Sequence, residues 1–161
     1  MKRTSPWHLR RARRADVSDL LDLMAAFNRA EGIRFRRAHV ALGLRRLLRA
    51  RRLGIVVVAE AAKSKGIIGY AVGTFGFDLE FGGPDAFVTE LFVRPPHRRG
   101  GLGARLLEAT VSALKDGGAG AVHLGVWPEN RAARRLYARA GFVETRRLMM
   151  TRVLPRAGSR Q

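Results

Sequence analysis

The sequence predicts an α/β (α+β) fold built as a single domain. Its 161 residues are the length of one domain, which buries roughly 70% of the surface that the unfolded chain exposes. Apolar residues alternate between solid or period-2 runs, typical of strands, and period-3.6 runs, typical of helices. No internal repeat is present, and no stretch approaches the ~20 apolar residues that span a bilayer. We expect one domain over residues 1–155 and a basic C-terminal tail at residues 156–161.

The N-terminal part predicts one strand and two helices. Trp7–Arg14 has the pattern of a first strand, and Asp16 is suited to N-cap a following helix. The buried stripe of that helix consists of Val17, Leu20, Leu21, Met24 and Phe27. A second helix, about Ala38–Arg51, buries its leucines and exposes its arginines.

Three consecutive strands follow. Ile55–Ala59 is a solid run rich in β-branched residues, which indicates a central strand buried on both faces. After a polar turn at Ala61–Gly66, strands are expected at Ile67–Phe77 and Ala86–Val93, separated by glycine and proline. This order favours an antiparallel meander.

The C-terminal part predicts a crossover. Pro95 and Pro96 end a strand, and a helix begins at Gly101. A short alternating strand around Val122 should then lie parallel to the strand before the helix. Asn130 is a good cap for another helix, and Leu148–Val153 has the pattern of a last strand.

The net charge of +18, from 31 basic and 13 acidic residues, is the compositional outlier. It invites a nucleic-acid interpretation through phosphate neutralisation. Nearly all the basic residues are arginines, however, a skew that GC-rich codon usage also produces, and we favour that explanation. Eight arginines between Arg34 and Arg52, with no acid among them, predict a local positive field whose purpose the sequence leaves open.

The composition also excludes several chemistries. The absence of cysteine excludes disulfides, thiolate metal sites and a cysteine nucleophile. The four histidines show no metal-ligand spacing, and no serine lies in a Gly-x-Ser-x-Gly elbow. The basic N-terminus lacks the apolar region of a signal peptide, so we expect a cytoplasmic protein that does not enter a membrane.

The segment Arg98–Ala104 has three properties that phosphate binding requires. Its glycines let a ligand approach the backbone, its amides are free, and it opens a helix with a partial positive charge. A dinucleotide fingerprint would need glycine where Leu106 stands, and a Walker loop would need Gly-Lys-Ser/Thr. The alternative to phosphate binding is that these glycines only form a tight turn at the start of a helix.

Arg98-Arg99-Gly100-Gly101-Leu102-Gly103 matches the Arg/Gln-x-x-Gly-x-Gly/Ala signature of the GNAT superfamily of N-acetyltransferases. The segment Glu90–Val93 looks like the family's fourth strand, and Asn130–Tyr137 followed by Gly141-Phe142 is similar to its second signature. In element order the chain resembles the family from about Trp7 to Val153. The resemblance implies a mixed, mostly antiparallel sheet of about six to seven strands with flanking helices, splayed between strands four and five.

The resemblance also implies acetyl-CoA as the acyl donor. The backbone of the fourth strand would pair with the pantetheine arm. The amides of the segment Arg98–Ala104, here called the glycine loop, would hold the pyrophosphate. A backbone N–H near the thioester could also stabilise the charge that develops on its oxygen. The implied coenzyme A residues are Leu91, Phe92, Val93, Arg98, Arg99, Gly100, Gly101, Leu102, Gly103, Ala104, Asn130 and Tyr137.

Two residues are implied to carry the chemistry. In the family, a tyrosine equivalent to Tyr137 protonates the departing coenzyme A sulfur, which suits a phenol with a pKa of ~10. A buried aromatic on the apolar face of the helix is the alternative. An attacking amine must lose a proton, and Glu90, on the strand that borders the thioester, is the candidate base or an anchor for the ammonium. An ideal strand turns Glu90 to the other face of the sheet, and a bulge would reverse that. Two alternatives stay open: Glu90 is a solvated carboxylate at the sheet edge, or the base acts through a water molecule.

The acceptor is the least specified part. We expect direct transfer to a primary amine of a small molecule, with a protein lysine or N-terminus as the alternative. A basic, non-catalytic module that binds RNA or the ribosome is the more remote one. If the arginine-rich helix faces the site, it would repel polyamines and favour an acceptor with a carboxylate or phosphate, or a peptide with acidic residues. The family resemblance leaves a homodimer open.

Overall fold

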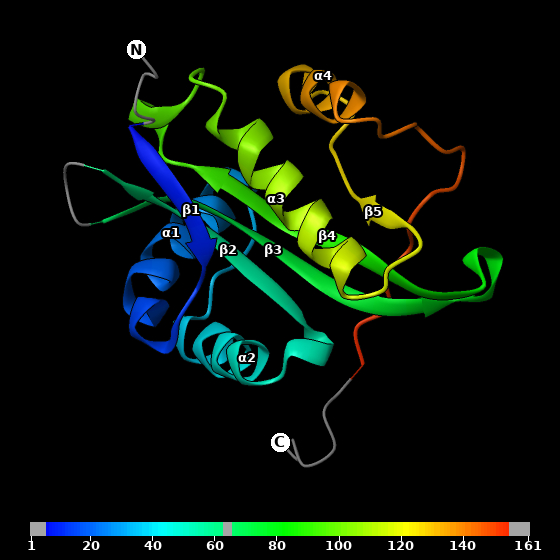
Figure 1. Cartoon of the computed structure of the whole chain (residues 1–161), viewed down its shortest axis with the longest axis horizontal. Coiled ribbons are helices and arrows are strands. Elements are labelled where there is room, and N and C mark those ends of the chain that lie inside the picture. The colour runs from blue at the N-terminus through cyan, green and yellow to red at the C-terminus, as the bar shows by residue number, and fades with distance from the viewer. Residues whose placement is uncertain (1–5, 63–65, 155–161) are drawn as a thin grey trace.

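The computed structural model describes residues 6–62 and 66–154 and contains one mixed sheet (Figure 1). Its five strands follow the order β1-β2-β3-β4-β5. The first four pair antiparallel, and β5 pairs parallel with β4. The strands are β1 (Trp7–Arg11), β2 (Gly54–Ala61), β3 (Ile67–Asp78), β4 (Gly83–Val93) and β5 (Val122–Leu124). The predicted α/β class, the antiparallel meander and the parallel crossover are confirmed.

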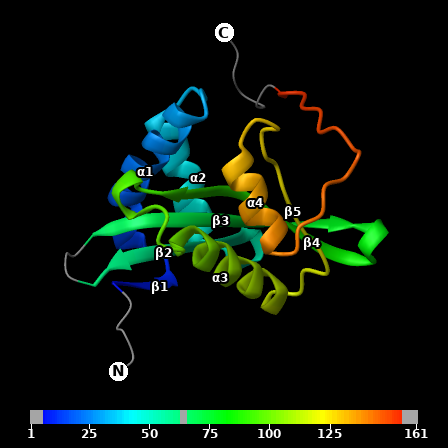
Figure 2. The same ribbon diagram turned by 90° about the horizontal axis from the view of Figure 1, so that it is seen from above.

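Helices cover both faces of the sheet (Figure 2). α1 (Val17–Ala30) and α2 (Arg37–Arg49) pack on one face, and α3 (Leu102–Asp116) packs on the other. α4 (Arg131–Arg139) follows β5 and places Leu136 and Tyr137 against the α3 side of the core. Within the described residues, no helix is long and apolar enough to cross a membrane.

The interior strand β2 shows why its sequence is apolar without alternation. Ile55 and Val57 belong to the core under α3, whereas Val56 and Val58 belong to the core under α1 and α2. Each of these side chains is buried. A strand that is covered on both faces leaves no position for a polar residue, so the prediction of burial on both faces is confirmed.

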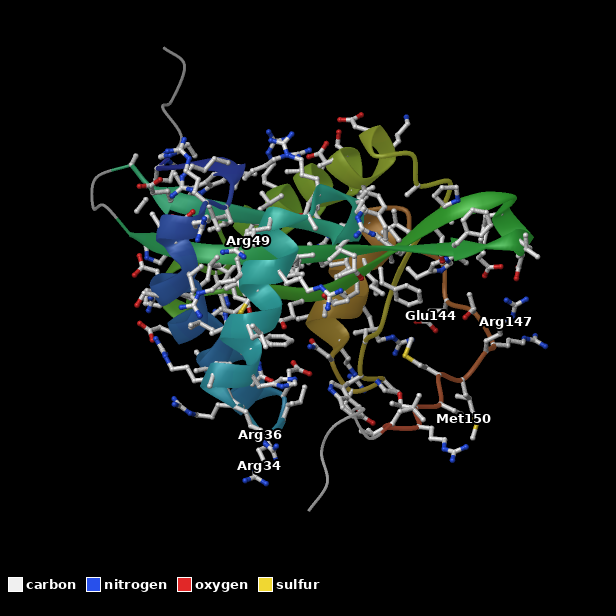
Figure 3. The ribbon with its side chains drawn as sticks, turned by 90° about the horizontal axis from the view of Figure 1, so that it is seen from below. Arg34, Arg36, Arg49, Glu144, Arg147 and Met150 are labelled. Atoms are coloured by element: carbon white, nitrogen blue, oxygen red, sulfur yellow. The ribbon has the colours of Figure 1, made fainter. Side chains whose placement is uncertain are left out.

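The prediction of about six to seven strands is too high, because the sheet has five strands within residues 6–62 and 66–154. Leu148–Val153, expected as the last strand, pairs with no strand within the described residues, and Leu148 and Met150 are 91% and 93% exposed. Arg134 pairs with Glu144, and Arg147 pairs with Glu80. Figure 3 shows Glu144, Arg147 and Met150 on a segment that runs outside the sheet. An alternating pattern predicts a strand only where a sheet edge is within reach. The tail predicted at residues 156–161 lies outside the described residues.

The splay between the fourth and fifth strands is present. β5 pairs with β4 only through Ala86, Phe87 and Val88. The five residues of β4 after Val88, which end at Val93, have no β5 partner. The edge of β4 that precedes the glycine loop is therefore open.

Asp16 differs from its predicted role as the N-cap of α1. No backbone amide of α1 bonds to its side chain. The carboxylate instead accepts hydrogen bonds from the backbone N–H of Arg13 at 2.6 Å and from both terminal nitrogens of Arg10 at 2.7 and 2.8 Å. Arg10 also donates to Glu60 of β2 at 2.8 Å. Asp16 thus joins the end of β1 to the turn that starts α1, and the bond from Arg10 lowers the pKa of its carboxyl group.

Replacing Asp16 by Asn should lower the free energy of unfolding at neutral pH by about 2 kcal/mol, because charge-assisted hydrogen bonds of a nearly buried carboxylate are lost. The pKa of Asp16 is lower in the folded chain. Its contribution is therefore present above the unfolded-state value of ~3.9 and disappears as the pH falls through the folded value. Urea unfolding across a pH series measures the difference. Asp19→Asn, at an exposed position in the first turn of α1, is the control. An equal effect of both variants would contradict this role.

Candidate active site

The open part of β4 begins with a β-bulge. Val72 of β3 lies opposite Glu90, whereas the next residue, Gly73, lies opposite Val88, so Thr89 is an extra residue in β4. Val88 faces the core under α3, and Phe92 faces the core under α1 and α2. Strict alternation from Val88 would place Phe92 on the α3 face. The bulge therefore reverses the face on which Glu90 and Phe92 lie.

Glu90 contacts a tyrosine of the neighbouring strand. The hydroxyl of Tyr70, which is fully buried, donates a hydrogen bond of 2.5 Å to Oε2 of Glu90. Burial raises the pKa of Glu90, while the bond from Tyr70 acts in the opposite direction. Burial and the charge of Glu90 hold the pKa of Tyr70 far above its usual value, so Tyr70 remains a proton donor. Glu90 is thus a half-buried carboxylate with a defined partner, and the interpretation as a solvated edge residue is wrong.

A cavity of about 350 Å³ lies beside the open edge of β4. Four separate segments form it: the end of α1, the end of β4, the glycine loop and the loop before α4. Five of its eight lining residues are among those that the family resemblance implies for coenzyme A. The lining consists of Phe27, Ala30, Glu31, Leu91, Phe92, Val93, Arg98 and Asn130.

Aromatic rings and a guanidinium group form one wall of this cavity. Phe27 and Phe92 meet edge to face with their centroids 6.4 Å apart. The guanidinium of Arg98 lies 5.4 Å from the centre of the Phe92 ring, and its Nε donates to the carbonyl oxygen of Val93 at 2.8 Å. Arg98 is therefore fixed against the strand that it follows.

A carboxylate that sequence reasoning missed forms the wall on the α1 side. Glu31, directly after α1, accepts a 2.7 Å hydrogen bond at Oε2 from the indole Nε1 of Trp127. Trp127 lies 96 positions away, in the loop before α4. This contact joins the two sides of the cavity. No motif marks Glu31 in the sequence, because its role depends on how α1 and this loop meet in space.

Tyr137 lies on α4 near this carboxylate. Its ring packs edge to face on Phe142 with centroids 6.1 Å apart, as expected of an apolar helix face. Burial raises the pKa of Tyr137, and the negative charge of Glu31 raises it further. The phenol is therefore protonated at neutral pH. Asn130 caps α4 by accepting a hydrogen bond from the N–H of Ala133 at 3.1 Å, which confirms the predicted cap.

The glycine loop has the backbone geometry of an anion site. Gly101, the N-cap of α3, has φ +80°, and Arg99 has φ +64°, an uncommon value for a residue with a side chain. Left-handed residues at a helix start turn successive N–H groups toward one side, and the first turn of α3 leaves amides without intrahelical partners. A Cβ at Gly100 would meet no atom within 4 Å, and one at Gly103 would meet nothing closer than 3.9 Å. Folding alone therefore does not require glycine at these two positions, and the backbone at Gly100 is open.

The open edge of β4 offers backbone groups to a ligand. The N–H of Arg94 bonds to Ile68 of β3. By the alternation along a strand, the backbone groups of Leu91 and Val93 point to the open side. Arg98 already bonds to the carbonyl of Val93. The N–H groups of Leu91 and Val93 and the carbonyl of Leu91 are left to pair with an extended ligand that carries amides.

Comparison with known proteins agrees with this geometry. The family model described as "Acetyltransferase (GNAT) family" matches residues 20–142. The chain belongs to the GNAT acetyltransferase family. It is therefore an acetyltransferase, and its acyl donor is acetyl-CoA. No curated protein matches the sequence.

Solved structures with this fold have diverse descriptions. An integron cassette protein from the mobile metagenome of Cole Harbour Salt Marsh is 31% identical, with a TM-score of 0.79 over 92% of this chain and 91% of that one. The aminoglycoside N-acetyltransferase AAC(6')-Iy, in complex with a bisubstrate analogue, is 23% identical, with a TM-score of 0.78 over 94% and 100%. A ribosomal-protein-alanine N-acetyltransferase from Brucella melitensis biovar Abortus 2308 is 14% identical, with a TM-score of 0.69 over 91% and 99%. The last two likenesses concern the fold alone.

Proposed function

We propose that this GNAT enzyme transfers acetyl directly from acetyl-CoA to a primary amine of a small molecule. The cavity of about 350 Å³ carries the proposal, because it joins the open edge of β4 to the end of α1, which bears the carboxylate of Glu31. Its volume is at the lower end of the range of small-molecule sites. The bisubstrate analogue in the complex of AAC(6')-Iy joins coenzyme A to an acetylated neamine, an aminoglycoside. This supports a small amine as the acceptor here.

The proposed donor site consists of the two open backbone elements. The outward groups of Leu91 and Val93 would pair with the amides of the pantetheine arm, and Phe92 lies between them on the strand. The pyrophosphate would lie on the amides of residues 99–104, with the charges of Arg98 and Arg99 beside them. Asn130, in the loop before α4, also lines the cavity. Bound acetyl-CoA supplies the thioester whose acetyl group is transferred.

Two side chains would move protons in this proposal. An alkylammonium must lose one proton before its nitrogen attacks and a second after the C–N bond forms. Glu90, in direct contact or through a water molecule, would accept the first. Tyr137 would donate a proton to the departing sulfur and be reprotonated afterwards, so the net product is one proton released to solvent. The raised pKa of each group suits its task, because Glu90 becomes a stronger base and Tyr137 stays protonated.

Acetylation of a protein lysine or N-terminus is the second candidate. A ribosomal-protein-alanine N-acetyltransferase has this fold, which supports a protein acceptor as an alternative. Binding of RNA or the ribosome by the positive surface is a non-catalytic alternative. In that case the affinity for RNA would fall steeply as the salt concentration rises.

A panel of amines tests the function. We expect release of coenzyme A thiol from acetyl-CoA with small primary amines that include alkylamines, diamines and neamine. Lysine peptides and N-terminal peptides serve as the competing arm, and RNA binding is measured at physiological salt. Turnover of peptides alone would favour the protein acceptor. RNA affinity without thiol release would reject catalysis.

Gly103→Asp tests the donor loop, with Gly103→Ala as its control. The nearest atom would lie 3.9 Å from the new Cβ, and alanine suits a helix better than glycine. The signature admits alanine here, so Gly103→Ala should keep both the melting temperature and the acetyl-CoA affinity of the wild type or raise them slightly. Gly103→Asp brings a negative charge to the proposed phosphate site, so its affinity for acetyl-CoA should fall about tenfold or more in calorimetry. Unchanged affinity of Gly103→Asp would contradict pyrophosphate binding by this loop.

Tyr137→Phe tests the acid. The variant keeps the ring contact with Phe142 but has no proton to donate. We expect kcat to fall by about 100-fold, the lower end of the range for general acid catalysis, with little change in acetyl-CoA affinity. If kcat is unchanged across pH, Tyr137 serves only in packing.

Glu90→Gln tests the base. At saturating amine, kcat of the wild type should fall as the pH drops through the pKa of Glu90, which burial has raised above the usual ~4.3. The variant should be slower at neutral pH and should lack this acidic limb. Steady-state rates across the acidic and neutral range measure both. An acidic limb that persists in the variant would assign it to another group.

A further inference from the structure

Glu31 lies at the cavity without a cationic partner. Within the described residues, arginines form ion pairs with six other carboxylates: Asp16, Asp22, Glu60, Glu80, Glu108 and Glu144. Glu31 instead accepts one neutral hydrogen bond, from Trp127, at Oε2. No hydrogen bond to its Oε1 is present in the part of the chain that the structure describes. In a protein of net charge +18, this carboxylate has no cationic partner and one open oxygen among the described residues.

The arginine-rich segment does not supply the missing partner. Arg45, Arg46 and Arg49 lie on the exposed side of α2, beside Leu42, and line a different surface depression. Arg34 and Arg36 project into solvent from the segment between α1 and α2 (Figure 3). None of these residues lines the cavity. The expectation of an acceptor with a carboxylate or phosphate depended on arginines facing the site, and they do not face it.

The cation that does line the cavity is occupied elsewhere. Arg98 bonds to the carbonyl of Val93 and lies over the ring of Phe92, on the β4 wall. It forms no ion pair with Glu31 among the described residues. Phe27 and Phe92 supply an apolar surface between these groups. The cavity thus has a fixed cation on the donor side and a free carboxylate on the α1 side.

We propose that Glu31 binds a second cationic group of the acceptor, so that the preferred acceptors are diamines or other amines with two positive charges. The inference rests on the proposed function and adds the substrate class to it. Trp127 would hold Oε2 in place and leave Oε1 to receive the distal ammonium. The methylene chain of the acceptor would lie along Phe27 and Phe92, and its other amine would reach the acetyl group. Glu31 is then a specificity-determining residue, distinct from the proposed base Glu90.

The test compares acceptors that differ only in their distal group. Diaminopropane, diaminobutane, diaminopentane and diaminohexane are assayed by thiol release beside amino alcohols of the same chain lengths. For the best chain length, wild-type kcat/KM should be at least about tenfold higher for the diamine, because a charged group is exchanged for a neutral one at a carboxylate. Glu31→Gln should bring this ratio close to one, mainly through KM of the diamine.

Matched variants separate specificity from folding. The amide oxygen of Gln can still accept the hydrogen bond from Trp127, so the melting temperature and acetyl-CoA affinity of Glu31→Gln report whether the cavity is intact. Glu31→Asp keeps the charge on a shorter side chain, and its preference should move to a longer diamine. Glu129→Gln removes an exposed carboxylate of the same loop as Trp127 that does not line the cavity, and it should keep the wild-type ratio.

The outcomes distinguish the two levels of the proposal. If the wild type acetylates amines and Glu31→Gln keeps the wild-type ratio, the role of Glu31 is rejected and the proposed function stands. A wild-type preference for an amino acid such as aminobutyrate over the diamine rejects it as well. If the wild type releases no thiol with any amine, the proposed function fails and this inference fails with it.

Discussion

The register of β4 is the constraint on which the site depends. This strand pairs with β3 over its whole length but with β5 only up to Val88, and one extra residue, Thr89, is inserted where that second pairing ends. The bulge turns Glu90 and Phe92 toward α1, and the loss of β5 frees the backbone that follows. A regular strand paired on both sides would place the carboxylate under α3 and would satisfy the edge. The open edge and the proposed base therefore have one structural origin.

Much of the fold could be predicted because local patterns determine it. The solid apolar run of β2, the helical stripes and the glycines before α3 each carry their structure in a few neighbouring residues. Five of the residues that the family resemblance implies for coenzyme A, Leu91, Phe92, Val93, Arg98 and Asn130, line one cavity, and their binding of the donor stays a prediction. Features set by distant contacts escaped prediction. Asp16 looked like a helix cap, but Arg10 and Arg13 bind its carboxylate, and Leu148–Val153 has a strand pattern without a strand beside it.

Tyr70 and Glu31 illustrate the same limit in the site. A tyrosine in an otherwise apolar strand signals that its hydroxyl needs a partner, yet the sequence could not name Glu90, 20 positions away. Glu31 and Trp127 are 96 positions apart. In both cases a neutral aromatic donor orients a carboxylate without cancelling its charge, whereas a guanidinium, as at Asp16, would neutralise it. Among the described residues, the chain thus keeps two carboxylates without a cationic partner in the region where its proposed chemistry uses them.

The outward arginines of α2 and the segment before it have a consequence for the rates at which the two substrates arrive. A positive surface field accelerates the encounter with an anion such as acetyl-CoA and slows the approach of a dication. Added salt would weaken both effects, because screening shortens the range of the field. The donor would then associate faster than a cationic acceptor at low ionic strength, and its phosphates, once bound, would reduce the barrier for the acceptor. Long-range electrostatics alone would thus favour an order of addition in which the donor binds first.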